Sequence, residues 1–159
     1  MKVKYSNLSD FNELIALSRE VESLFGPMAD EVTFQEALRN AILEKNVYCI
    51  RPSSNNEDHN LIGAIIISRE QNEIAWFAVS DKYKKQGYGK QLLKFAIDQL
   101  NIDKNIFVQT FDESIPEGKA ARKLYSAFGF IDYKDGGLNP AGIPTVIMRL
   151  GSSHNQLEI

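Results

Sequence analysis

The sequence is poor in the residues that build disulfide bonds and metal centres. Its 159 residues include one cysteine and two histidines. Cys49 therefore has no partner for an internal disulfide bond, and a cysteine-based metal cluster is excluded. His59 stands in a polar loop and His154 in the C-terminal segment, and neither has a neighbouring ligand pattern. We therefore predict no metal site.

Long hydrophobic runs are missing as well. Apolar runs such as residues 64–67 are far shorter than the about 20 residues needed to span a bilayer. The N-terminal residues lack the apolar stretch of a secretion signal. We therefore expect a soluble, cytoplasmic protein that has no membrane partner.

The sequence also lacks an excess of positive charge. The chain has 18 Lys and Arg against 21 Asp and Glu, which gives a formal net charge of −3. Nucleic-acid-binding proteins concentrate basic charge, so we expect no nucleic-acid partner. The composition, 43% hydrophobic and 25% charged residues, is typical of a soluble globular protein. We expect a single domain over residues 1–150 and a flexible C-terminal tail over residues 151–159.

The spacing of apolar residues predicts helices and strands mixed along one chain. Ser9 and Thr33 are expected helix N-caps, and Glu36 completes a capping box with Thr33. Strands 61–68 and 74–79 are nearly continuous in apolar residues, so both faces of each should be covered. The order of elements predicts an α/β protein of the α+β type with a mixed sheet. Helices are expected over residues 9–25, from 33 onward, over 87–100 and over 117–128, and strands over 2–6, 47–50, 61–68, 74–79, 106–111, 130–134 and 145–150.

The segment 79–93 carries the strongest chemical pattern. An apolar strand leads into a loop with two glycines, Gly87 and Gly89, and then into a helix. Unpaired N–H groups at a helix start, close backbone approach at glycine and nearby ammonium groups all favour an anion such as phosphate. Four lysines stand in this segment: Lys82, Lys84, Lys85 and Lys90.

Two well-known phosphate-binding patterns do not match this loop. The chain has no G-x-x-x-x-G-K-[ST] string, and Leu92 stands where the dinucleotide-binding pattern needs its third glycine. The spacing alone also fits a plain turn in which the glycines only shape the backbone and the lysines are solvated. The residues by themselves leave these two interpretations open.

Two motifs resemble those of the GNAT (Gcn5-related) N-acetyltransferase superfamily. Residues 84–89 resemble its acetyl-CoA-binding motif, [RQ]-x-x-G-x-[GA], with Lys84 where the family usually has Arg or Gln. Residues 121–130 resemble its A-x-x-L-Y-x-x-x-G-F segment, and the order of elements agrees over about residues 2–150. The resemblance implies a GNAT-like fold, with a central, mostly antiparallel mixed sheet flanked by about four helices.

The same resemblance implies acetyl-CoA as co-substrate. In this family the strand before the phosphate loop splays from the next strand, and the pantetheine arm enters the gap. The backbone N–H of Phe77 would polarise the thioester carbonyl. Phe77 and Val79 would also be apolar in any buried strand, so this role rests on their main chain. The implied cofactor-binding residues are Phe77, Ala78, Val79, Lys84, Lys85, Gln86, Gly87, Tyr88, Gly89, Lys90 and Ala121.

Tyr125 matches the family tyrosine that protonates the departing CoA thiolate. A phenol with a pKa of roughly 10 can protonate a thiolate whose conjugate thiol has a pKa of roughly 8.5 in an organised site. The alternative is a core tyrosine on the inward face of a helix. The family often has Asn seven residues earlier, where this chain has Gly118. The polar contact is then absent, or it comes from Lys119 or Ser114.

Direct transfer to an amine also needs a base, because an ammonium group has no lone pair. Glu73 is the first candidate, at the position where histone-acetylating relatives carry theirs. The alternative is an exposed glutamate at a strand start. Glu20 and Glu22 are further candidates, or are simply solvated.

The acceptor side carries a weaker pattern. In this fold the segments that match residues 25–31 and 135–144 border the acceptor pocket. Asp30 and Glu31 suit a cationic amine, but we favour a role at the helix dipole. The expected partner is a small-molecule or peptide amine, and a homodimer is compatible with the family.

The resemblance therefore predicts an acetyl-CoA-dependent N-acetyltransferase that works by direct attack in a ternary complex. Two alternatives remain at this point. One is a non-catalytic acyl-CoA-binding module of the same fold. The other is an unrelated α/β protein that binds a different phosphate.

Overall fold

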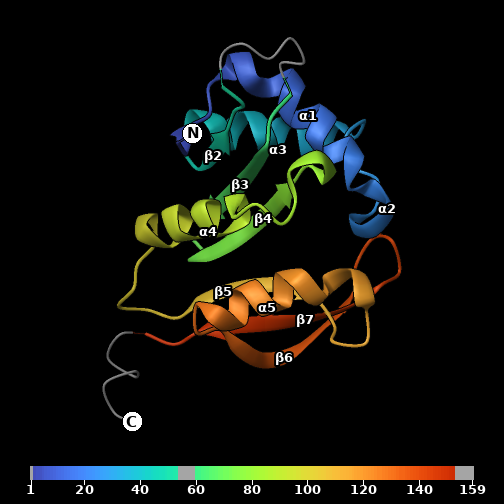
Figure 1. The fold of residues 1–159 in the computed structure, drawn as a ribbon, viewed down its shortest axis with the longest axis vertical. Helices are drawn as coiled ribbons and strands as arrows, with labels where there is room; N and C mark the ends of the chain where they lie inside the picture. The colour runs from blue at the N-terminus through green and yellow to red at the C-terminus, as the bar shows by residue number, and fades with distance from the viewer. Residues whose placement is uncertain (1, 54–59, 153–159) are drawn as a thin grey trace.

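A seven-stranded sheet forms the centre of the protein (Figure 1). The structure is a computed structural model that describes residues 2–53 and 60–152. The strand order is β1-β2-β3-β4-β5-β7-β6, and only the β4–β5 pair is parallel. The predicted mixed, mostly antiparallel sheet is confirmed. Its strands are β1 (Lys4–Tyr5), β2 (Val47–Ile50), β3 (Gly63–Ser68), β4 (Glu73–Val79), β5 (Ile106–Phe111), β6 (Ile131–Leu138) and β7 (Pro144–Leu150).

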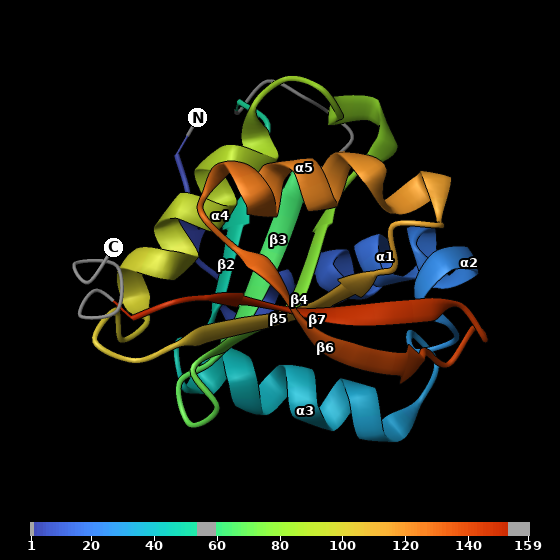
Figure 2. The ribbon, with the colours of Figure 1, turned by 90° about the horizontal axis from the view of Figure 1, so that it is seen from below.

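Helices cover the two faces of the sheet unequally. In Figure 2, α4 and α5 lie on one side of the sheet and α3 lies on the other. None of the described helices is long and apolar enough to cross a membrane. The α-helices are α1 (Phe11–Glu20), α2 (Glu22–Phe25), α3 (Val32–Leu43), α4 (Tyr88–Gln99) and α5 (Lys119–Ala127), with short 3₁₀ turns at Leu8–Asp10, Asp81–Tyr83 and Pro116–Gly118.

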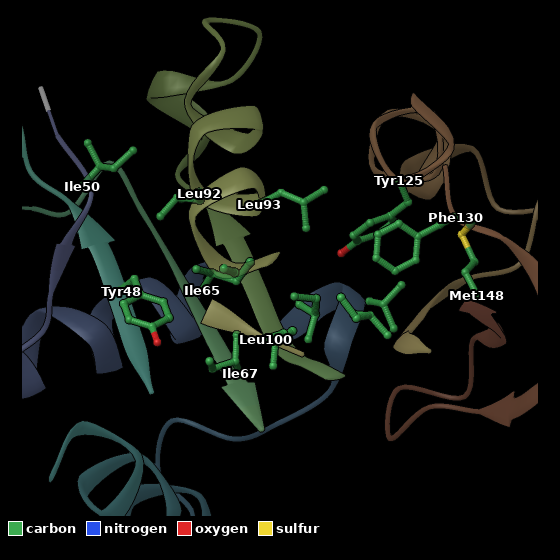
Figure 3. Close-up of a cluster of buried hydrophobic side chains, with 14 of the residues drawn as sticks. Tyr48, Ile50, Ile65, Ile67, Leu92, Leu93, Leu100, Tyr125, Phe130 and Met148 are labelled. Carbon is green, nitrogen blue, oxygen red and sulfur yellow. The ribbon is translucent and has the colours of Figure 1, made fainter. Parts of the chain in front are cut away.

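The hydrophobic core forms one layer on each side of the sheet. The layer under α4 and α5 includes Ile65, Leu92 and Leu93, none of which is exposed to solvent (Figure 3). The layer under α1 and α3 includes Leu14 and Leu38. Burying each such side chain stabilises the fold by about 1.5–3 kcal/mol, so these layers fix the sheet on which the site is built.

The predicted first helix is interrupted. Val21 leaves helical geometry (φ −104°, ψ 5°) and its N–H donates to Ser18 C=O, so α1 ends at Glu20 and α2 is a separate short helix. The break adds one α-helix to the expected four. The predicted N-cap at Ser9 is also wrong, because that residue lies inside a 3₁₀ turn. The backbone N–H of Asn7 donates to Asp10 Oδ2 at 2.7 Å across this turn.

The predicted capping box at Thr33 is wrong as well. Helix α3 begins at Val32 and its N-cap is the extended Glu31 (φ −85°, ψ 127°), so Thr33 already lies in the first turn. The preceding loop sets this start. Arg19 holds Asp30 in a two-point ion pair with distances of 2.9 and 3.0 Å.

The final hairpin extends further than predicted. Strand β6 continues to Leu138, so the first part of the expected 135–144 loop is strand. Two β-bulges, at Tyr133 and Gly136, interrupt the pairing with β7 without ending the strand. The start of the expected tail is anchored too, since the N–H of Ser152 donates to Asn105 Oδ1 at 3.0 Å. The rest of that tail lies outside the described residues.

Candidate active site

Strands β4 and β5 split apart, as the resemblance implied. They pair only at Glu73–Phe107 and Ile74–Val108, although both strands continue for several residues beyond. Asn72 pins the closed end of the split. Its side chain donates to the carbonyls of Asn101 and Asn105, both at 2.9 Å. The split therefore opens toward the loop that follows β4.

A β-bulge in β4 redistributes its side chains between the two faces of the sheet. The register with β3 shifts between Ile66 and Ile67, which leaves Ala75 as the extra residue. Ile74 and Phe77 therefore both pack against the core under α4 and α5, although they are three residues apart. Trp76 and Ala78 pack on the α1–α3 side. The expectation that both faces of β4 are covered fails at Ala75, which is exposed beside the split.

The bulge also decides where Glu73 lies. Its neighbour Ile74 faces the α4–α5 core, so the Glu73 side chain faces the α1–α3 side of the sheet, as Trp76 does. Burial raises the pKa of the Glu73 carboxyl above its ordinary value. Glu73 is thus half-buried on the face opposite Phe77, and a raised pKa is what a proton acceptor near neutral pH needs.

The backbone of β4 points N–H groups into the split. The N–H of Ser80 donates to Ile62 C=O at 2.8 Å, on the β3 side of the strand. N–H groups of successive strand residues point alternately to the two sides. Those of Phe77 and Val79 therefore point away from β3, toward the side where β5 has separated. This is the direction that the expected role of Phe77 requires.

The loop after β4 joins the open end of the split to the start of α4. Lys85 and Gly87 have left-handed backbones, with φ of 62° and 87°, and Gly87 is the N-cap of α4. The first intrahelical hydrogen bond joins Gln91 N–H to Gly87 C=O. The N–H groups of the residues before Gln91 therefore have no acceptor within the helix. A Cβ atom on Gly87 would meet nothing within 4 Å. The loop thus offers an open backbone cradle of the kind that binds phosphates.

Exposed lysines stand in this loop and in the first turn of α4. Lys82, Lys84, Lys85, Gln86 and Lys90 are all exposed, whereas Tyr88 and Gly89 are half-buried. Lys84 is partly neutralised by an ion pair with Asp81 at 2.7 Å. Lys85 and Lys90 place positive charge near the start of α4, where an anion would bind.

Glu20 holds this loop in place. Its Oε1 accepts from Ser80 Oγ at 3.0 Å and from the N–H of Asp81 at 3.3 Å. Glu22 is also engaged, since its Oε2 accepts from the N–H of Met28 at 2.7 Å. Both of these candidates therefore take part in structural hydrogen bonds. Asp30, the candidate for amine binding, is occupied by Arg19.

Tyr125 lies across the split from Phe77. It is 4% exposed, and its ring contacts those of Phe77 and Phe130 with centroids 6.3 and 5.6 Å apart. Figure 3 shows its hydroxyl oxygen pointing away from Phe130, toward the side of Leu93 and α4. Burial raises the pKa of this phenol, so it stays protonated at neutral pH. Ala121, one helical turn earlier, is half-buried on the same face.

Gly118 departs from the family pattern for a steric reason. A Cβ atom on Gly118 would lie 2.5 Å from Phe111 Cβ, so the ring of Phe111 occupies the space that a side chain would need. The two replacements considered for the missing polar contact, Ser114 and Lys119, line a hollow of about 440 Å³ together with Arg122. Lys119 is the first residue of α5, and Ser114 lies in the turn between β5 and that helix.

Several site residues were missed by sequence reasoning. Asn72 fixes the closed end of the split, and the rings of Phe25 and Phe111 approach each other with centroids 5.8 Å apart. No local pattern marks these residues, because each acts through contacts distant in sequence. His59 and His154 lie outside the described residues. Cys49 is buried, as expected, and burial raises the pKa of its thiol.

The described residues fit acetyl-CoA. An open cradle follows β4 at Gly87, and the split beside it has backbone N–H groups on one side and Tyr125 on the other. A Cβ atom on Gly89 would lie 3.5 Å from Phe77 and 3.7 Å from Val79, so this glycine faces the same split. These features match the path that the resemblance assigns to pyrophosphate and pantetheine.

Comparison with solved structures places the fold among acetyltransferases. An Arabidopsis thaliana NAA60 structure with a bisubstrate analogue has a TM-score of 0.70 at 14% identity, over 95% of this chain and 97% of that chain. A chain of the NatC complex bound to Gag peptide and CoA has a TM-score of 0.68 at 20% identity, over 96% of this chain and 100% of that chain. Spermidine N-acetyltransferase from Vibrio cholerae, with CoA and spermine, has a TM-score of 0.64 at 18% identity, over 96% of this chain and 95% of that chain.

These likenesses confirm the expected GNAT-like fold. None of the curated proteins matches the chain. A family model described as the acetyltransferase (GNAT) domain matches residues 19–152, which is most of the chain. The chain therefore belongs to the GNAT acetyltransferase family.

Proposed function

We propose that the protein transfers an acetyl group from acetyl-CoA to an amine by direct attack in a ternary complex. One observation carries the proposal. The split between β4 and β5 opens at the N-terminus of α4 and has the N–H groups of Phe77 and Val79 directed into it. This arrangement supplies an extended-strand partner for a pantetheine arm and an anion cradle for the attached pyrophosphate.

The binding residues divide by the part of acetyl-CoA that they would hold. The first turn of α4 and the exposed Lys85 and Lys90 would bind the pyrophosphate. The backbone of 77–79 would pair with the pantetheine amides. The N–H of Phe77 would donate to the thioester oxygen and stabilise the negative charge that develops on it.

The two proton-transfer groups would lie on opposite faces of the split. Glu73, on the α1–α3 side, would take the proton of the incoming ammonium directly or through a water molecule. The neutral amine attacks the thioester carbon, so that the N–C bond forms and the C–S bond breaks. Tyr125, on the α4–α5 side, would give its proton to the departing thiolate. The second proton that the nitrogen loses as the amide forms would pass to solvent, from which Tyr125 regains its own.

An amine acceptor is supported by what related folds hold. The NAA60 structure contains a bisubstrate analogue, the NatC complex a Gag peptide, and the Vibrio cholerae enzyme spermine. Glu73 is a half-buried carboxylate with no cationic partner among the described residues, which is consistent with the deprotonation that such acceptors need.

The test is a thiol-release screen with acetyl-CoA over alkylamines, polyamines, amino acids and short peptides. The proposal predicts amine-dependent release of CoA and an acetylated amine in the product mixture. Calorimetry on the same preparation measures acetyl-CoA binding separately. Tight binding with no release for any amine would instead identify a non-catalytic acyl-CoA-binding module, which the absent polar side chain at Gly118 favours.

A further inference from the structure

The acceptor amine has a restricted route to the split, if the proposed function holds. The phosphate cradle, Gly89 and Tyr125 lie on the α4–α5 side of the sheet. The acetyl-CoA arm would fill that side. An amine must then reach the thioester carbon from the α1–α3 side, where Glu73 faces. Whatever narrows the split on this side determines which amines can react.

The ring of Phe25 bridges the split on the acceptor side. Its centroid lies 6.3 Å from the Trp76 ring, edge-on at 88°, and 5.8 Å from the Phe111 ring. Trp76 belongs to β4 and Phe111 to β5, at a level where the two strands no longer pair. One aromatic ring from α2 therefore spans the two separated strands.

Contacts on both sides restrain this bridging ring. Phe111 is 8% exposed and is backed by Gly118, where even a Cβ atom would clash with it. The Phe111 ring therefore cannot move toward Gly118 to make room for Phe25. Trp76, on the other side, packs into the core layer under α1 and α3.

A clasp from the β6–β7 hairpin holds the backbone that carries Phe25. Asn139 Nδ2 donates to the carbonyl of Leu24 at 2.8 Å, across 115 positions of sequence. A Cβ atom on Gly26 would lie 2.6 Å from Pro140 Cβ, so the two segments are in close contact there as well. Asn139 also stabilises its own turn, because its Oδ1 accepts from the N–H groups of Ala141 and Ile143 at 2.9 and 3.0 Å.

We propose that Phe25, held by this clasp, is a specificity-determining residue that restricts the acceptor to unbranched primary alkylamines. A CH₂–NH₂ terminus is slender, and its methylene chain packs favourably against the aromatic rings of Phe25, Trp76 and Phe111. A substituent on the carbon next to nitrogen widens the reacting end and collides with the bridging ring. Discrimination by one methyl group in such a site amounts to about 10–200-fold in kcat/KM.

The test compares n-butylamine with sec-butylamine as acceptors. These isomers have the same composition and nearly the same basicity, and they differ only in the branch beside nitrogen. The wild-type protein should prefer n-butylamine by about 10-fold or more in kcat/KM. Phe25→Ala should reduce this preference to within about threefold, mainly by raising the rate with sec-butylamine. Tyr5→Ala is the matched control, because Tyr5 also loses aromatic contacts but lies on β1 at the far edge of the sheet.

Asn139→Asp provides a second, independent variant. It keeps the oxygen that accepts from Ala141 and Ile143 and removes the donor to Leu24. It should weaken the preference in the same direction, because the new carboxylate oxygen repels the Leu24 carbonyl. Thermal melting checks that the variant remains folded. Equal rates for the two butylamines, or an unchanged preference in both variants, would overturn the role of Phe25. Turnover of other amines but not of n-butylamine would overturn the acceptor class, and no turnover of any amine would overturn the proposed function instead.

Discussion

Gly118 and Phe111 are so close that no side chain fits between them: a Cβ atom on Gly118 would lie 2.5 Å from Phe111 Cβ and 2.8 Å from Cδ2. Gly118 has an ordinary helical backbone (φ −90°, ψ −4°), so steric exclusion and not conformational freedom requires glycine here. The position that holds Asn in many relatives is thus filled by the ring of Phe111, which in turn supports Phe25.

Gly118→Ala should therefore destabilise the protein by about 1–3 kcal/mol, because the new methyl group forces Phe111 or α5 to move. Urea unfolding monitored by circular dichroism measures the change in free energy of unfolding. Gly151→Ala is the control, since a Cβ atom there meets nothing within 4 Å and should leave stability unchanged. Equal stability of both variants would show that the contact does not restrict position 118.

Gly89→Ala should separate cofactor binding from folding. The added methyl group makes only ordinary contacts, 3.5 Å from Leu124 and Phe77, and alanine favours a helix by up to about 1 kcal/mol over glycine. The melting temperature should stay constant or rise, while the Kd for acetyl-CoA increases because the methyl group points into the split. Calorimetric titration measures the affinity.

Gly87→Ala is the companion variant and should behave differently. Its methyl group meets nothing, but the left-handed backbone at φ 87° disfavours alanine by about 1–2 kcal/mol. It should lower stability even without ligand. Acetyl-CoA affinity that is unaffected in Gly89→Ala would contradict the proposed path of the pantetheine arm.

Tyr125→Phe should lower kcat by about 100-fold or more while leaving the fold intact. No described residue hydrogen-bonds the Tyr125 hydroxyl, so its removal breaks no contact within the described part of the chain. Single-turnover kinetics and thermal melting on the same samples separate the two effects. A variant that melts like wild type and turns over at the wild-type rate would assign Tyr125 to the core alone.

The segments that carry the acetyl-CoA pattern could be predicted from the sequence because their structure is local. The strand ending at Val79, the glycine loop and the helix from Tyr88 are read from consecutive residues, and α5 from its helical spacing. The bulge at Ala75 could not be predicted, because it is defined by register with β3. The clasp between Asn139 and Leu24 joins residues 115 positions apart, beyond any local pattern.

The break in the helix at Val21 could not be predicted from the sequence either. Neither glycine nor proline stands at that position, and the apolar residues continue the helical spacing on both sides of it. The following loop is held against the two helices on either side of the break. The Glu22 carboxylate accepts a hydrogen bond from the N–H of Met28, and Arg19 forms an ion pair with Asp30. These are tertiary contacts that override local propensity.

Glu73→Gln should remove the acid limb of the pH–rate profile. Burial raises the pKa of the Glu73 carboxyl, so its base form appears at a higher pH than for an exposed glutamate. In the wild type, kcat/KM should rise with pH through that raised pKa, and in the variant the rise should be absent. An identical acid limb in both proteins would assign the proton acceptor elsewhere.

The same shift predicts how stability responds to pH. Because the pKa of Glu73 is raised in the folded protein, the protonated form stabilises the fold below the unfolded pKa. This contribution is lost as pH rises through the folded pKa. Glu73→Gln, which cannot ionise, should therefore gain stability relative to wild type on going from acidic to neutral pH. Denaturant midpoints measured across that range report the difference.

Initial-rate kinetics with both substrates varied tests the central claim most directly. Direct transfer between acetyl-CoA and an amine, bound together across the β4–β5 split, predicts double-reciprocal lines that intersect. Gly89→Ala should preserve this pattern while raising the KM for acetyl-CoA. Parallel lines, together with an acetylated protein detected by mass spectrometry when acetyl-CoA is added alone, would contradict direct transfer.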